Sequence, residues 1–123
     1  MDVALKILLV EDSPTDVLLA QDALDDRRQF DVTVADRLAR ALDLLAERPF
    51  DIVLLDLGLP DSQGLDTLLR LRQGNSPIPV IVMTARDDED LAIKAVQEGA
   101  QDCLVKSQLQ AYFLGSHKHL AHP

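Results

Sequence analysis

The sequence predicts an α/β fold in which a doubly wound, five-stranded parallel sheet carries helices on both faces. Five short apolar runs alternate with segments whose apolar residues have helical spacing. Most of the runs are continuous, which is typical of parallel strands covered on both faces, whereas Phe30–Val34 alternates between apolar and polar residues. Turn and capping residues separate them, and the chain contains no internal repeat and no low-complexity linker. This pattern favours one layered α/β domain.

Length, charge and cysteine content narrow the class of protein. The 123 residues fit a single domain, residues 1–123, that buries its core without metal or disulfide staples. The net charge of -9 argues against direct binding of nucleic acid or anionic membranes and suits a cationic ligand. No signal peptide or apolar run approaching about 20 residues is readable, and the single Cys103 excludes an internal disulfide. We therefore expect a soluble, cytoplasmic protein.

The first β-α-β unit occupies the first third of the chain. Strands are predicted at Leu5–Val10 and Phe30–Val34. Between them, Ser13 is a suitable helix cap, with Pro14 at the first helical position and Asp16 as a partial capping-box acid.

The second helix and the third strand lie on either side of Pro49. Asp36 is the expected N-terminal cap of the second helix, which must end before Pro49. The apolar stripe of this helix has i, i+3, i+4 and i+7 spacing: Leu38, Ala41, Leu42 and Leu45. The third strand, Ile52–Leu55, is a continuous apolar run that leads directly into Asp56.

The third helix and the fourth strand repeat this alternation. Apolar spacing that begins at Leu65 predicts the helix, and the turn residues from Gly74 to Pro77 break it. The fourth strand, Pro79–Met83, then leads into Thr84.

The last third of the chain contains the fourth helix and the fifth strand. Four acids at positions 87–90 open the helix, for which Gly99 is the expected C-terminal cap. The short fifth strand is Asp102–Val105. We expect a core of about residues 5–109, then a short or irregular last helix and a tail within residues 110–123. The predicted strand order is the flavodoxin-like 2-1-3-4-5.

Polar residues follow four of these strands at the point where each strand ends. They are Glu11 and Asp12, then Asp56, Thr84 and Lys106. Because the carboxyl ends of parallel strands meet at one edge of the sheet, the three carboxylates should converge and repel one another unless a hard cation such as Mg²⁺ lies among them.

This set of groups is what acyl-phosphate chemistry requires. A carboxylate is the nucleophile, a divalent ion shields charge, and a lysine and a hydroxyl hold the remaining phosphoryl oxygens. Each residue alone has an ordinary structural explanation, such as a turn, a strand end or a solvated charge. Their occurrence together, in order and at strand ends, favours the functional interpretation.

From about Lys6 to Leu109 the chain resembles the receiver domains of two-component response regulators, the CheY-like family. The motifs that carry the resemblance are LLVEDSPTD, DIVLLDLGLPDSQGLD, PVIVMTAR and EGAQDCLVKS. The resemblance implies that Asp56 is the phosphoacceptor. It also implies a Mg²⁺ (or Mn²⁺) site formed by Asp12 directly, Glu11 mainly through water, Asp56, and the backbone carbonyl of Gly58.

The resemblance further implies the switch and the partners. Thr84 would be the hydroxyl that moves to the phosphoryl group, and Lys106 would be its ion-pair partner. The phosphoryl donor would be a sensor histidine kinase or a histidine phosphotransfer protein, and the surface formed by the fourth helix, the fifth strand and the last helix of the family would respond. The downstream partner is a separate protein or a fused output domain that the sequence does not identify. Such a domain is a signalling module that catalyses only its own phosphorylation and dephosphorylation.

Two residues near the fifth strand depart from the family pattern. Cys103 stands where receivers usually have Tyr or Phe, so rotation of an aromatic ring cannot report phosphorylation. Ser107 replaces the usual proline, which leaves the coupling between phosphorylation and output open. Cys103 is either a redox-sensing thiol or a small packing residue, and the neighbouring Asp102 favours packing. The histidines at positions 117, 119 and 122 fit a polar tail better than a metal site.

Two alternative functions share part of this pattern. A haloacid-dehalogenase-like phosphatase also combines Asp, Thr or Ser, Lys and Mg²⁺, but normally has an Asp-x-Asp motif after the first strand, where this chain has Glu11–Asp12. The other alternative is a receiver-like interaction module that never uses phosphate. Turnover of an aryl phosphate would indicate the phosphatase, and a response to acetyl phosphate or beryllofluoride would exclude the module.

Overall fold

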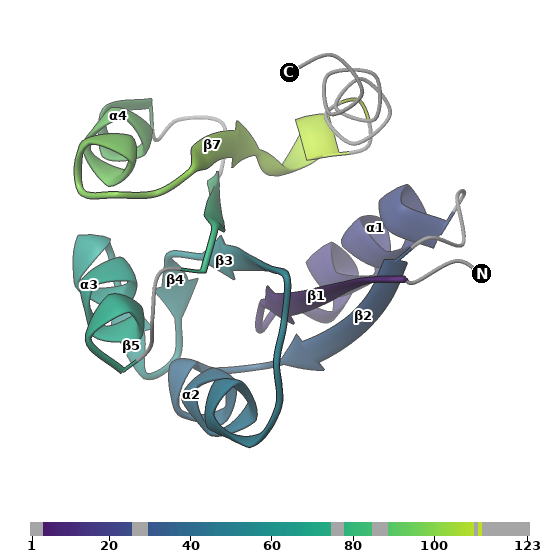
Figure 1. Ribbon diagram of the computed structural model, residues 1–123. Coiled ribbons are helices and arrows are strands. Elements are labelled where there is room, and N and C mark those ends of the chain that lie inside the picture. The colour runs from purple at the N-terminus through teal and green to yellow at the C-terminus, as the bar shows by residue number, and fades with distance from the viewer. Residues whose placement is uncertain (1–3, 26–29, 75–77, 85–88, 110, 112–123) are drawn as a thin grey trace, which may run out of the picture.

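Five parallel strands form the central sheet of the computed structural model, which describes residues 4–25, 30–74, 78–84, 89–109 and 111. The strand order is β2-β1-β3-β6-β7 (Figure 1). Because β4 and β5 belong to a separate hairpin, β6 and β7 are the fourth and fifth strands of this sheet, so the order is the predicted 2-1-3-4-5. The strands are β1 Leu5–Val10, β2 Phe30–Ala35, β3 Ile52–Asp56, β6 Val80–Thr84 and β7 Asp102–Val105. Each agrees with its prediction to within one residue at either end.

Helices cover both faces of this sheet. Helices α2, α3 and α4 lie along one side and α1 lies on the other (Figure 1). They are α1 Pro14–Asp25, α2 Leu38–Glu47, α3 Leu65–Gly74 and α4 Glu89–Gln97, followed by the short 3-10 helix η1 Lys106–Gln108. The doubly wound architecture is therefore confirmed. The expected last helix and the histidine-containing tail lie outside the described residues, except for Leu109 and Ala111.

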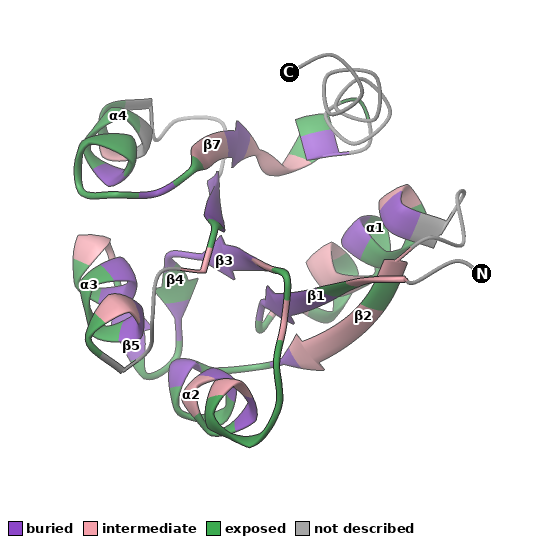
Figure 2. Ribbon diagram, in the orientation of Figure 1, coloured by how far each residue is buried: buried purple, intermediate pink, exposed green. Residues whose placement is uncertain are grey.

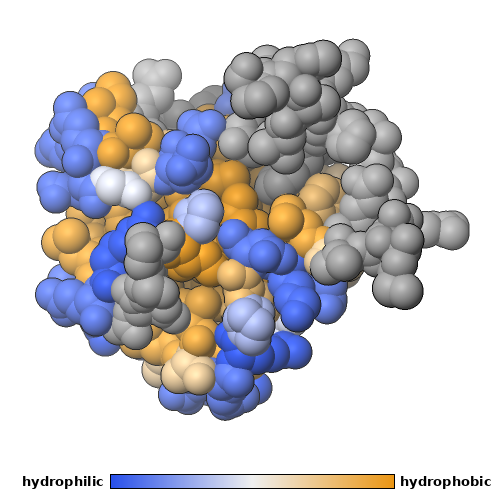
Figure 3. Space-filling view, in the orientation of Figure 1, coloured by the Kyte–Doolittle hydropathy of each residue, from blue (hydrophilic) through white to orange (hydrophobic). Residues whose placement is uncertain are grey.

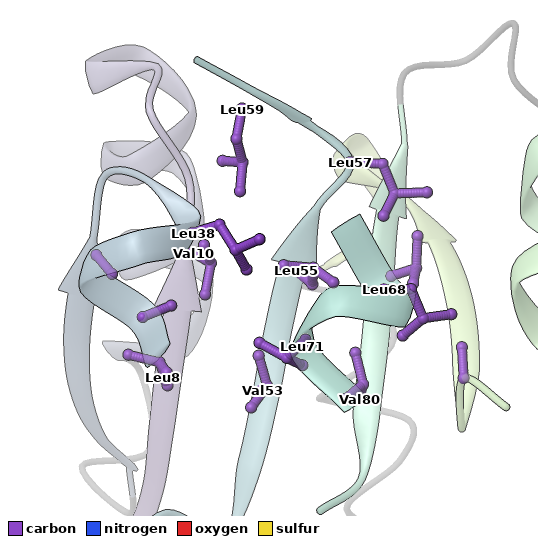
Figure 4. Close-up of a cluster of buried hydrophobic side chains, with 14 of the residues drawn as sticks. Leu8, Val10, Leu38, Val53, Leu55, Leu57, Leu59, Leu68, Leu71 and Val80 are labelled. Carbon is purple, nitrogen blue, oxygen red and sulfur yellow. The ribbon is translucent and has the colours of Figure 1, made fainter. Parts of the chain in front are cut away.

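Alternation along the strands sends side chains into two separate cores. Figure 2 shows that most of β1 and β3 is buried. In β1, Leu8 and Val10 pack toward α2 and α3, whereas Ile7 and Leu9 pack toward α1, and all four are fully buried. Figure 4 shows the larger core, where strand and helix side chains interdigitate: Leu8, Val10, Val53, Leu55 and Val80 with Leu38, Leu68 and Leu71. In the face shown in Figure 3, hydrophilic residues lie mainly at the periphery and hydrophobic ones toward the centre.

The parallel register aligns the strand ends that matter for function. Val10 pairs with Leu55, Asp56 pairs with Met83, and Thr84 pairs with Val105. The residues that follow β1 and β7 therefore lie beside the last residues of β3 and β6. This arrangement creates one polar edge of the sheet.

A two-stranded hairpin after β3 was not predicted. Its strands, β4 Gly58–Leu59 and β5 Ser62–Gln63, are antiparallel and only two residues long. Leu59 is buried in the core, and the hydroxyls of Ser62 and Thr67 lie 2.9 Å apart in a buried hydrogen bond to α3. Two-residue strands are too short to leave a periodic pattern in the sequence.

The cap of α2 is also not the residue that the sequence indicated. Asp36 lies too early, because the helix begins at Leu38 and its N-cap position is Arg37, which makes no side-chain cap. Asp36 instead pairs with Arg37 at 3.5 Å. The cap comes from Asp61 in the hairpin turn, whose carboxylate accepts the N–H groups of Leu38 and Ala39.

The expected cap at the end of α4 is confirmed. Gly99 has a φ of +109°, and the Ala100 N–H donates to the Ala95 carbonyl at 3.0 Å, as in a Schellman motif. Within the part of the chain that the structure describes, no helix has the length and apolarity needed to cross a membrane.

Candidate functional site

Three carboxylates meet at the polar edge of the sheet, as the strand ends predicted. Ligand oxygens of Glu11, Asp12 and Asp56 all lie within 4.8 Å of one another. They line a cavity of about 390 Å³ that also includes Thr84 and Lys106. Gly58 lines the same cavity, so every predicted site residue lies in one place.

The sheet and its first loop hold the two buried acids in position. Glu11 extends the pairing of β1, since its N–H donates to the Ala35 carbonyl at 2.9 Å, and only 1% of its surface is exposed. Asp56 ends β3, is 8% exposed, and accepts the Gly58 N–H at 3.3 Å through Oδ1. Asp12, by contrast, is exposed to solvent. The cluster therefore has a fixed buried side and an open side.

Lys106 supplies the positive charge of the site. Its Nζ lies 2.7 Å from Asp16 Oδ2, 2.9 Å from Glu11 Oε1 and 3.6 Å from Asp56 Oδ1. Partial burial lowers the pKa of Lys106, but the carboxylates of Asp16, Glu11 and Asp56 raise it by more, so the net pKa is well above its ordinary value. The ammonium group stays protonated throughout the neutral range.

Glu11 is the most perturbed acid of the site. Burial raises its pKa, the nearby charge of Asp56 raises it further, and Lys106 only partly offsets both, so the pKa of Glu11 rises to about 7. The site holds four carboxyl groups, those of Glu11, Asp12, Asp16 and Asp56, but one ammonium group, which leaves an excess of negative charge. Hard oxygen donors with unbalanced negative charge are the ligand set that Mg²⁺ and Mn²⁺ prefer. The cluster of Glu11, Asp12 and Asp56 therefore fits a divalent metal ion.

Thr84 and Cys103 lie on neighbouring strands beside this cluster. Thr84 is buried, and its hydroxyl donates to the Leu104 carbonyl at 3.5 Å, a long and weak hydrogen bond.

Cys103 packs against the larger core. Burial together with the charge of Asp102 raises the pKa of its thiol, while the Thr84 hydroxyl lowers this pKa in part. A half-buried thiol of raised pKa behaves as a packing group, which agrees with the interpretation favoured above. The peptide bond between Lys106 and Ser107 is trans.

The sequence predicted a different role for Asp16, which the structure places against Lys106. Asp16 was expected to complete a capping box with Ser13, and half of that box is present, since Ser13 Oγ accepts the Asp16 N–H at 3.3 Å. The reciprocal bond is absent, because the Ser13 N–H donates to Glu11 and the Asp16 carboxylate pairs with Lys106. The sequence signal for the contact with Lys106 was an acid in the first turn of a helix that starts at the polar edge of the sheet.

Comparison with known proteins identifies a family whose resemblance to this sequence predicted the same site residues. The family model described as "Response regulator receiver domain" matches residues 7–114. The chain belongs to this receiver family. Such domains receive phosphoryl groups in two-component systems. The phosphatase alternative is not supported, since the candidate nucleophile Asp56 lies at the end of β3 and not after β1.

Individual relatives are response regulators. The transcriptional regulatory protein KdpE of Mycobacterium tuberculosis is 41% identical over 100 residues, which are 81% of this receiver chain and 43% of KdpE. The BeF3-activated receiver domain of Klebsiella pneumoniae RstA is 30% identical, with a TM-score of 0.79, 96% of this chain covered and 99% of that chain. The Mn(2+)-bound form of response regulator Rcp1 is 27% identical, with a TM-score of 0.72, 87% of this chain covered and 90% of that chain.

These matches concern the receiver domain and not whole regulators. The chain spans less than half the length of the curated relatives that it matches. The relatives therefore establish the family of this chain.

Proposed function

We propose that this chain is a single receiver domain in which Asp56 accepts a phosphoryl group from the phosphohistidine of a sensor kinase or of a histidine phosphotransfer protein. One observation carries the proposal. The Asp56 carboxylate ends a central strand, lies beside Glu11 and Asp12, and faces the Lys106 ammonium group 3.6 Å away. A nucleophile, cation ligands and a fixed positive charge are thus combined in one cavity.

The transfer is a displacement at phosphorus. An Asp56 carboxylate oxygen forms the new O–P bond while the N–P bond of the phosphohistidine breaks, and the departing imidazole nitrogen keeps the electron pair of that bond. Lys106 is placed to pair with a phosphoryl oxygen, and the Thr84 hydroxyl to donate to another. Later attack by water on phosphorus restores the Asp56 carboxylate and releases inorganic phosphate. The domain catalyses these two steps on itself and no turnover of other substrates.

The residues that would hold the metal ion are Asp12, Asp56 and the carbonyl of Gly58, with Glu11 acting mainly through water. When bound, Mg²⁺, or Mn²⁺ in its place, would supply positive charge that shields the incoming phosphoryl group. The donor set supports this assignment, because all of these ligands are hard oxygens. We place the reaction in the cytoplasm, where a single free cysteine is stable.

Modification by a small phosphoryl donor tests the proposal. The chain is incubated with acetyl phosphate and Mg²⁺, and intact mass spectrometry measures the addition of one phosphoryl group. We expect modification of the wild-type chain and none of Asp56→Asn, since the amide is a poor nucleophile. Asp66→Asn is the matched control, because it makes the same charge change at an exposed residue of α3.

Three outcomes would contradict the proposal. Equal modification of wild type and Asp56→Asn would place the phosphoryl group elsewhere. No response of the wild type to either acetyl phosphate or beryllofluoride would favour an interaction module that does not use phosphate. Sustained, Mg²⁺-dependent release of product from an aryl phosphate would indicate a phosphatase.

A further inference from the structure

The shortest contact of Lys106 is not with the proposed phosphoacceptor. Its ammonium group lies 2.7 Å from Asp16 Oδ2, near the start of α1, and 3.6 Å from Asp56 Oδ1. Asp16 and Lys106 are separated by 90 positions in the sequence, and both side chains are partly buried, at 30% and 25% exposure. The ion pair therefore joins two segments that are distant in the chain, and it is shielded from part of the solvent.

The Lys106 ammonium group makes its two short contacts with carboxylates other than that of Asp56. Lysine offers three N–H donors, and three carboxylates surround it: Asp16, Glu11 and Asp56. Two of these contacts are at hydrogen-bond distance and the third, to Asp56, is longer. The ammonium group is thus drawn toward Asp16 and Glu11, away from the residue that would carry the phosphoryl group.

The backbone fixes Asp16 where it can exert this pull. The Asp16 N–H donates to Ser13 Oγ at 3.3 Å, and the Val17 N–H donates to the Ser13 carbonyl at 2.9 Å, which anchors the first turn of α1 at the edge of the cavity. At the other end of the pair, Lys106 begins η1, and Leu109 immediately after η1 is buried against the core on the α1 side. The pair therefore spans two segments whose backbones are held in place.

We propose that Asp16 is a positioning residue that holds the Lys106 ammonium group in the unphosphorylated domain and competes with the phosphoryl group for it. The inference rests on the proposed function of Asp56. When the phosphoryl group arrives, its oxygens offer Lys106 a stronger partner than Asp56 alone, and the contact with Asp16 lengthens or breaks. Asp16 also adds a negative charge that opposes the phosphoryl anion. Both effects favour the unmodified state.

Neutralising Asp16 should therefore favour the phosphoryl-bound state. The test measures the affinity of the full chain for beryllofluoride in the presence of Mg²⁺, by titration followed in amide NMR spectra. We expect Asp16→Asn to bind beryllofluoride roughly threefold to tenfold more tightly than wild type. The control is Asp22→Asn, which makes the same charge change at an exposed residue of the same helix and should stay within about twofold of wild type.

A second readout reports the ion pair itself, without any ligand. The ammonium 15Nζ signal of Lys106, assigned by its loss in Lys106→Met, should shift or exchange away in Asp16→Asn and stay unchanged in Asp22→Asn. A purely structural role of Asp16 in starting α1 would not move this signal, because the N–H that donates to Ser13 Oγ belongs to the backbone and is kept in Asp16→Asn.

The outcomes separate this inference from the proposed function. Tighter binding by Asp16→Asn together with the changed Lys106 signal supports it. If the wild type binds beryllofluoride but Asp16→Asn binds with unchanged or weaker affinity, or leaves the Lys106 signal unchanged, the role of Asp16 is wrong while that of Asp56 stands. If the wild type does not bind beryllofluoride at all, both are wrong.

Discussion

Asp61 caps the helix that begins at Leu38, although it lies 23 residues further along the chain. Its Oδ1 accepts the Leu38 N–H at 2.9 Å, and its Oδ2 accepts the Ala39 N–H at 3.0 Å. Asp61 belongs to the loop that follows the proposed phosphoacceptor, and its carbonyl accepts Arg70 Nη1 at 3.1 Å. One turn residue thus ties the β4–β5 hairpin to both α2 and α3.

Replacing Asp61 with alanine should destabilise the domain by about 0.5 to 2 kcal/mol, the usual cost of removing a helix cap. The reason is that the first N–H groups of α2 would lose their carboxylate acceptor, and Arg37 offers no replacement. Urea unfolding measures the change. Asp43→Ala is the control, because it removes the same charge from the exposed face of α2, and it should cause no comparable loss.

The same cap gives a pH dependence with a definite sign. Asp61 is exposed, and although some loss of solvation raises its pKa, the N–H groups of Ala39 and Leu38 that donate to its carboxylate lower the pKa by more, so the folded value lies below 3.8. The stabilisation is therefore present above the unfolded pKa and is lost as pH falls through the lower folded value. Wild type and Asp61→Ala should converge in stability in acid, and a difference that stayed constant down to that range would contradict this account.

Divalent metal affinity should rise with pH across the neutral range. A metal ion requires the carboxylate form of Glu11, whose pKa of about 7 keeps it partly protonated near neutrality. We expect Mn²⁺ to bind roughly tenfold more tightly at pH 8 than at pH 6, since one proton is released near pH 7. Isothermal titration measures both affinities, and an affinity that did not change with pH would exclude Glu11 as the titrating group.

Glu11 should also affect stability in the absence of metal. Because its folded pKa of about 7 exceeds the unfolded value of 4.5, the folded state binds more protons between these values. The contribution of Glu11 is complete below pH 4.5, and the free energy of unfolding falls as pH rises toward 7. Glu11→Gln should remove this fall and also most of the pH dependence of Mn²⁺ binding.

Thr84→Val should separate modification from switching. The hydrogen bond of the hydroxyl to the Leu104 carbonyl is long, at 3.5 Å, so its loss should cost less than about 1 kcal/mol of stability. We expect Asp56 still to be modified by acetyl phosphate, while the chemical-shift changes at Leu104 and Val105 become smaller. Thr84→Ser keeps the hydroxyl and should retain them. Shift changes of full size in Thr84→Val would mean that this hydroxyl does not carry the signal.

Cys103 should react slowly with thiol reagents at neutral pH. Burial and the charge of Asp102 raise its pKa, so little thiolate is present. Asp102→Asn should speed the reaction with a disulfide reagent, because it removes the charge but can keep the hydrogen bond from the Cys103 N–H, which is 2.8 Å long in the wild type. An equal or slower rate in Asp102→Asn would show that burial alone controls this thiol.

Much of the fold and the site could be predicted because their causes are local. Apolar runs, continuous in most strands and alternating in β2, identified all five strands of the sheet. The polar residues after them, such as Glu11, Asp56 and Thr84, lie at strand ends that parallel pairing must bring together. The β4–β5 hairpin escaped prediction because strands of two residues have no period. The final helix lies mostly outside the described residues.

Only the tertiary structure determined which hydrogen-bond donor each aspartate side chain binds. The sequence placed Asp16 in a capping box and Asp36 before α2, since an acid near a helix start is a common cap. In the fold, the Asp16 carboxylate reaches Lys106 and the cap of α2 comes from Asp61. A carboxylate takes whichever donor the packed backbone brings closest, and that donor lies 90 residues away in one case and 23 in the other. The sequence by itself determined the sheet, its polar edge and the identity of the groups there, because strand order and side-chain alternation follow from local pattern.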